Sequence, residues 1–76
     1  MFGKAEMRHM LLEAVKSYPK IYRKLKREGM LEDYLDSRVN LMWNEYQGLV
    51  AGGLPEQMAF EEVAHEYIRH LGLGES

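Results

Sequence analysis

The segment from Leu31 to Ala51 most constrains the fold, because apolar residues cover an unusually wide part of its surface when it is arranged as a helix. With about 100° between successive residues, apolar residues three or four positions apart form one stripe along the helix, as in helices that face a core. That stripe contains Leu31, Leu35, Val39, Met42, Tyr46 and Leu49. Two further residues widen it on each flank, Tyr34 and Leu41 on one side and Trp43 and Val50 on the other. We therefore expect this helix either to be central in a bundle or to be covered in part by a second chain.

Residue usage indicates an all-α protein. The chain contains no threonine, and only six of its 76 residues are valine or isoleucine. Strands favour β-branched residues, whereas leucine, methionine, alanine, glutamate, lysine and arginine favour helices and dominate here. A chain of this length forms one domain, which we expect to comprise residues 1–76 and to have a small core.

Proline and glycine divide the chain into four expected helices. Pro19 and Pro55 each suit the first turn of a helix, where the missing N–H is not needed. Helix ends are expected at Gly29, at Gly52-Gly53, and at Gly72 and Gly74. We predict a small four-helix bundle with helices at about residues 4–17, 19–28, 31–51 and 55–71, the third of them central.

Composition also bears on the compartment. The chain has no cysteine, so it has neither disulfides nor thiolate metal ligands. Residues 1–6 contain no long apolar run, and nothing approaches the length of an apolar membrane span. We therefore expect no signal peptide, no membrane association and a location in the reducing cytoplasm.

The residues that could carry chemistry do not form a recognisable site. His65 and His70 are five residues apart, which separates them by about 140° around a helix and does not match a zinc-protease motif. Glu6 with His9, and Glu62 with His65, have the spacing of di-iron ligands, but each pair lies far from the apolar stripe of its helix. We therefore predict no enzymatic activity, no cofactor, no metal and no small-molecule substrate.

Charge is distributed unevenly along the chain. Residues 1–28 carry a net charge of +5, and residues 29–76 carry −7. Within the expected second helix, one face carries Lys20, Arg23, Lys24 and Arg27, with Lys26 beside them and Lys16 just upstream. This basic face could follow a phosphate backbone or could simply be a solvated helix surface. It could also pair with Glu61, Glu62 and Glu66 of the fourth helix, in the same or a neighbouring chain.

The flanks of the third helix supply the candidate protein-interaction residues. These are Leu41, Trp43, Tyr34 and Val50. Side chains of this kind are usually part of a core, but on a helix this apolar they could instead bind a partner or a second copy. Six methionines favour adaptable contacts of the same kind.

The junction between the second and third helices carries a distinctive series of residues. It reads Tyr22-x-x-Leu25-x-x-x-Gly29-x-Leu31-x-x-Tyr34-Leu35. This series resembles the central region of the small transposon-encoded proteins called TnpV, and the likeness covers about residues 8–50. The resemblance implies a bacterial accessory protein of mobile DNA, and it carries over no catalytic residue.

Two functions are therefore open on the sequence. The first is a non-enzymatic helical interaction module that self-associates or binds a protein partner. The alternative is a nucleic-acid-binding accessory protein of a mobile element, which would use the basic face of the second helix.

Overall fold

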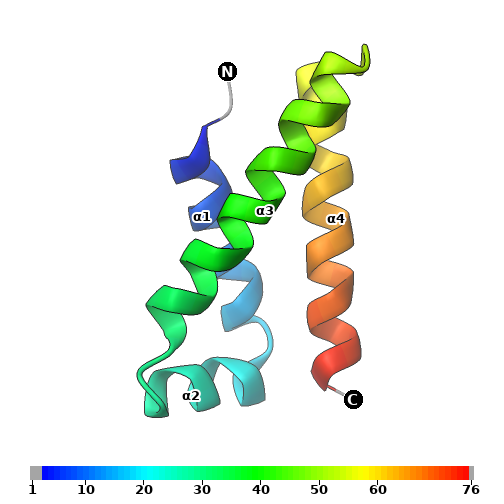
Figure 1. Ribbon diagram of the computed structural model, residues 1–76. Helices are drawn as coiled ribbons and strands as arrows, with labels where there is room; N and C mark the ends of the chain where they lie inside the picture. The colour runs from blue at the N-terminus through cyan, green and yellow to red at the C-terminus, as the bar shows by residue number, and fades with distance from the viewer. Residues whose placement is uncertain (1–2, 76) are drawn as a thin grey trace.

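The computed structural model describes residues 3–75, which form four α-helices and contain no strand (Figure 1). The helices are α1 (Lys4–Lys16), α2 (Pro19–Arg27), α3 (Leu31–Ala51) and α4 (Glu56–Glu75). The predicted all-α bundle is confirmed, and the predicted bounds of α3 are confirmed at both ends.

The central position of α3 is also confirmed. It runs diagonally between α1 and α4, while the short α2 crosses one end of the bundle (Figure 1). Each helix contacts the other three. The molecule is elongated, with extents of 40 × 22 × 15 Å.

The core is built by the three long helices. Its buried side chains are Met7, Leu11 and Val15 from α1, Leu35, Val39, Met42 and Tyr46 from α3, and Ala59, Val63 and Leu71 from α4. The short helix α2 buries no residue completely. It packs against the core through the half-buried side chains of Ile21, Tyr22 and Leu25. Because α2 covers the end of the bundle only on its apolar side, its opposite side is left in solvent.

One prediction for the α3 stripe is wrong. Leu49 was expected among the core residues, but 37% of its surface is exposed. It lies at the edge of the stripe, about 50° from the centre defined by the four buried residues of α3. The neighbouring α4 covers it from one side only, and a groove stays open beside it.

Two glycines end helices as predicted. Gly29 has a φ of 68° and Gly53 a φ of 106°, values that side-chain-bearing residues rarely adopt. The amide of Met30 donates to the carbonyl of Leu25 at 2.8 Å, and the amide of Leu54 donates to that of Leu49 at 3.1 Å. Both turns are Schellman motifs, in which the residue after the glycine bonds back across the last helical turn. These motifs make the tight connections from α2 to α3 and from α3 to α4.

The expected end of the fourth helix is wrong, because α4 continues through Gly72 to Glu75. A Cβ atom at Gly72 would lie 3.1 Å from the hydroxyl oxygen of Tyr18, the residue that precedes α2. Gly72 therefore permits a close approach between α4 and Tyr18 and does not stop the helix. The other differences are small: α1 and α2 each end one residue earlier than predicted, and α4 begins one residue later.

No helix in the described part of the chain combines the length and the apolar character that crossing a bilayer requires.

Candidate interaction surfaces

The basic face of α2 is exposed. Its residues are Lys20, Arg23, Lys24 and Arg27, and the flanking Lys16 and Lys26 are exposed as well. Within residues 3–75, none of these six side chains forms an ion pair with a carboxylate. The Arg23 Nε donates to the backbone carbonyl of Pro19 at 3.3 Å, and the Lys26 ammonium lies 5.4 Å from the centre of the Tyr22 ring. The face thus presents positive charge with which no carboxylate in the described part of the chain pairs.

The pairing of this face with acidic residues of the same chain is not found in the described residues. Glu66 instead pairs with Arg69 at 3.4 Å and with His70 at 3.9 Å, and Glu61 accepts a hydrogen bond from Gln57 at 3.4 Å. Pairing between neighbouring chains stays a prediction.

A groove lies between α3 and α4. Its lining consists of Glu45, Gly48 and Leu49 from α3 and Glu62, Val63 and Glu66 from α4, and its volume is about 320 Å³. Leu49 is 37% exposed and supplies apolar surface in the groove among three carboxylates, while Val63 lines the groove but is almost entirely buried. Gly48 adds no side chain, and a Cβ atom placed there would meet nothing within 4 Å. The groove is therefore open, apolar at its base and acidic at its edges.

The groove has neighbouring hollows on both sides. One is lined by Arg38, Tyr67 and His70 together with Glu45 and Glu66. The other is lined by Met58, Glu61 and His65 together with Glu62. The groove shares Glu45 and Glu66 with the first hollow and Glu62 with the second, so the three adjoin one another along α4.

A hydrogen bond links the two walls of this surface. The Tyr67 hydroxyl donates to Glu45 Oε1 at 3.3 Å. Burial raises the pKa of Tyr67 above its ordinary value, and the negative charge of Glu45 raises it further. The bond fixes Glu45 beside α4, where it contributes to the acidic edge of the groove.

The four predicted protein-interaction residues do not form one surface. Leu41 is 49% exposed and lies one helical turn before Glu45, on the groove side of α3. Tyr34 is half-buried on the same side, with the Arg38 guanidinium 5.0 Å from its ring centre.

Trp43 and Val50 are on the opposite flank of α3, half-buried against the core. The Trp43 ring stacks on Tyr46 with 5.3 Å between ring centres.

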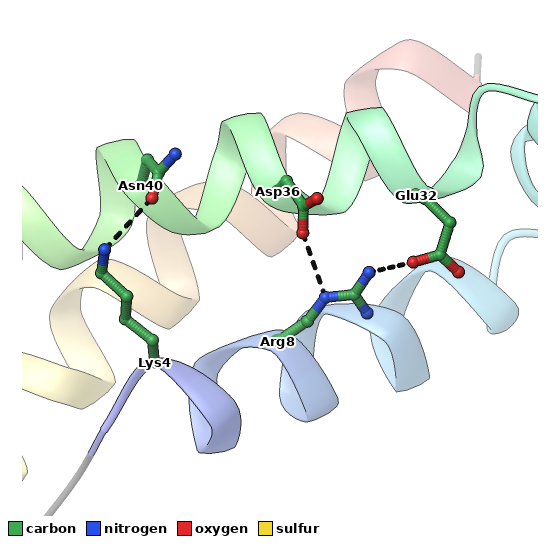
Figure 2. Close-up of polar contacts among 5 residues, drawn as sticks. All are labelled: Lys4, Arg8, Glu32, Asp36 and Asn40. Atoms are coloured by element: carbon green, nitrogen blue, oxygen red, sulfur yellow. Dashed lines mark hydrogen bonds and ion pairs between the residues drawn. The ribbon is translucent and has the colours of Figure 1, made fainter.

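A polar network joins α1 to α3 on the side away from the groove (Figure 2). The Arg8 guanidinium pairs with Glu32 and donates from Nε to Asp36 Oδ1 at 3.2 Å, and Lys4 Nζ donates to Asn40 Oδ1 at 3.3 Å. The hydrogen bonds to Glu32 and Asp36 raise the pKa of Arg8. The sequence analysis did not predict this network. Its sequence signal is that the polar residues are four positions apart on both helices, Lys4 and Arg8 on α1 and Glu32, Asp36 and Asn40 on α3.

The acid and histidine pairs considered from the sequence are all exposed. Glu6 accepts a hydrogen bond from the Gly3 amide at 3.0 Å and so caps α1, while His9 lies 4.0 Å from Glu13. His65 and His70 line different hollows along α4. Over the described residues, no group of three or more histidine, aspartate or glutamate side chains is placed to hold a metal ion.

In comparisons with known proteins, no family model, no curated protein and no solved structure matches this chain. The resemblance to the TnpV proteins therefore stays a prediction.

Proposed function

We propose that this protein is a non-enzymatic interaction module whose groove between α3 and α4 binds a protein segment with basic side chains. One observation carries the proposal: Glu45, Glu62 and Glu66 surround apolar surface in an open groove. Apolar contact would supply most of the affinity, and the carboxylates would select and orient a positively charged partner. A cytoplasmic location is part of the proposal, supported by the lack of cysteine.

The distribution of exposed apolar side chains supports this choice. The large apolar side chains that are exposed in the described chain are Met30, Leu41, Leu49 and Met58. Three of these four lie near the groove: Leu49 lines it, Met58 lines the hollow beside it, and Leu41 lies one turn from Glu45, whereas Met30 precedes α3 and lines none of the three hollows. Apolar residues gathered in one region of a surface are typical of a binding site, whereas scattered ones are not.

Other features support a non-enzymatic role. The hydroxyl of Ser17 donates to the carbonyl of Glu13 at 3.2 Å, so it is used within its own helix. Ser37 is exposed on α3. Neither serine has a histidine beside it among the contacts of the described residues, as nucleophilic catalysis would require.

A peptide-binding experiment tests the proposal. The probe is a fluorescent amphipathic helical peptide with lysine and arginine on its polar face, and the comparison peptide carries glutamate at those positions. We expect the basic peptide to bind and the acidic one not to bind. The variant E45Q/E62Q/E66Q should weaken binding by about tenfold or more, because the selecting charges are lost.

A matched control keeps the charge change but moves it away from the groove. The variant E13Q/D33N/E56Q alters three exposed carboxylates elsewhere on the helices and should bind the basic peptide as the wild type does. Equal loss of binding in both variants, or no loss in either, would contradict the proposal.

Nucleic-acid binding by α2 is the second candidate, and the unpaired state of its basic face favours it. Six exposed cations along one short segment can contact successive phosphates and release counterions. The candidate predicts binding to double-stranded DNA or to RNA that weakens steeply as salt rises. The variant K20Q/R23Q/K24Q/R27Q should abolish that binding, and an unchanged affinity would exclude the candidate.

A further inference from the structure

We propose that the basic face of α2 in one copy of the chain docks in the α3–α4 groove of a second copy. This inference rests on the proposed function of the groove and names its occupant. It joins two surfaces of opposite charge. Within the described residues the basic face forms no ion pair, and in the groove Glu62 has no partner, while Glu45 and Glu66 make only exposed contacts with Tyr67, Arg69 and His70.

The two surfaces are opposite in charge, and the row of cations is long enough to extend past the carboxylates of the groove. Lys20, Arg23, Lys24 and Arg27 follow the spacing of a single helix face, and the first and last are about 10 Å apart along α2. In the groove, Glu62 and Glu66 are one helical turn apart, about 6 Å, and Glu45 lies across from them. A helix lying along the groove would therefore bring at least three of its cations next to carboxylates.

The fold separates these surfaces within one chain. The α4 residues of the groove, 62–66, lie in the middle of that helix, whereas α2 crosses the end of the bundle where α4 finishes (Figure 1). No ion pair joins the basic face to the groove in the described residues. A second copy of the chain can bring its basic face to this groove.

The donor helix is already held in a binding conformation. Ile21, Tyr22 and Leu25 pack against the core of their own chain, which turns the cations outward. Docking therefore needs no unfolding of α2, and the only ordering cost is that of the long side chains.

Gly48 leaves room for the close approach of a helix at the groove. Gly48 lies inside α3, where glycine is less favourable than alanine, and among the described residues nothing lies within 4 Å of its Cβ position. A missing side chain there lets a partner helix approach closely. The aliphatic parts of the lysine and arginine side chains can then lie over Leu49 and Met58 while their charged ends reach the carboxylates.

Sedimentation of charge-reversed variants tests the inference. The basic-face variant is K20E/R23E/K24E/R27E, and the groove variant is E45K/E62K/E66K. We expect the wild type to self-associate at high micromolar concentrations, with a dissociation constant that rises by about tenfold or more at high salt. Each variant alone should be monomeric at concentrations where the wild type associates.

Mixing the two variants gives the decisive result. Each supplies the charge that the other has lost, so the equimolar mixture should associate again. The variant E13K/D33K/E56K has the same net charge as the groove variant and should self-associate as the wild type does. Association of the groove variant alone at wild-type strength, or no recovery on mixing, overturns the inference.

An uncharged change provides a second measure that does not depend on net charge. Gly48→Gln adds a side chain at the groove from a Cβ position that meets nothing within 4 Å, so it should weaken self-association by about tenfold while the helix content stays unchanged. Wild-type association in this variant contradicts close docking at Gly48.

Three outcomes separate this inference from the function on which it rests. A wild type that stays monomeric at every concentration overturns self-docking, and the basic peptide would still bind if the groove has its proposed function. If the wild type stays monomeric and the basic peptide does not bind either, both self-docking and the proposed function of the groove are overturned. Association that disappears after nuclease treatment also overturns self-docking, because nucleic acid would then be bridging the copies.

Discussion

Arg8 of α1 bonds to Asp36 of α3 across 28 residues of sequence, with 3.2 Å between Nε and Oδ1 (Figure 2). The same guanidinium pairs with Glu32 one turn earlier on α3. All three side chains are partly or largely exposed, so water and salt compete with the network. It holds the register between two helices whose buried side chains supply the main stabilisation.

The first prediction concerns this network. Arg8→Met and Asp36→Asn should each slightly lower the free energy of unfolding. Because the two residues interact, the double variant should lose less free energy than the sum of the two single losses. The coupling should fade as salt approaches about 1 M. Urea unfolding of the four proteins at low and high salt measures it, and a coupling unaffected by salt would contradict an exposed ion pair.

Adjacent residues in α3 give a second prediction. Met42 is completely buried, whereas Leu41 is half exposed on the groove side. Met42→Ala should therefore lower the free energy of unfolding by about 2–5 kcal/mol, because it leaves a cavity in the core. Leu41→Ala should change it by no more than about 0.5 kcal/mol. Chemical denaturation of both variants checks the difference, and a similar loss in both would mean that α3 is rotated from its described orientation.

Two glycines give the third prediction, with opposite signs. Gly48→Ala should raise the free energy of unfolding by about 0.5–1 kcal/mol, because the position is helical and has open space around it. Gly29→Ala should lower it by about 1 kcal/mol, because φ there is +68°. Thermal and chemical unfolding distinguish the two, and a destabilised Gly48→Ala variant would contradict the open space beside that residue.

Local patterns in the sequence were enough to predict most of the fold. The buried residues of α1 and α3 recur every three or four positions, so their core-facing sides could be identified in advance. Gly29 and Gly53 end helices because their backbone angles require glycine, which is a local property. Gly72 looks the same in the sequence but is explained by Tyr18, a residue 54 positions away. Such a distinction requires the tertiary structure.

The candidate site was predicted only in part. The charged face of α2 could be predicted because all of its residues belong to one helix. The groove could not, because Glu45 and Leu49 come from α3 while Glu62 and Glu66 come from α4. Which flanks of two helices meet depends on how they pack, and an apolar residue such as Leu49 is exposed or buried according to that packing.

The last prediction concerns Tyr67 and alkaline pH. Burial and the neighbouring Glu45 raise the pKa of Tyr67 above its ordinary value of 10.0, so the folded state favours the protonated hydroxyl. The contribution to stability is fully present below about pH 10, near the pKa of Tyr67 in the unfolded chain. It is lost as pH rises through the higher pKa of the folded state, because the Tyr67 hydroxyl of the unfolded chain releases its proton first. Burial raises the pKa of Tyr46 in the same direction.

Tyr67→Phe should therefore reduce the fall in unfolding free energy above pH 10, and Tyr46 should account for part of the slope that is left. Glu45→Gln should reduce the fall less than Tyr67→Phe does, because it removes the carboxylate charge and leaves the burial. Urea denaturation at a series of pH values between about 8 and 11 measures these slopes. A wild-type slope in the Tyr67→Phe variant would show that the hydroxyl reaches water freely and that Glu45 is not held at the groove by this bond.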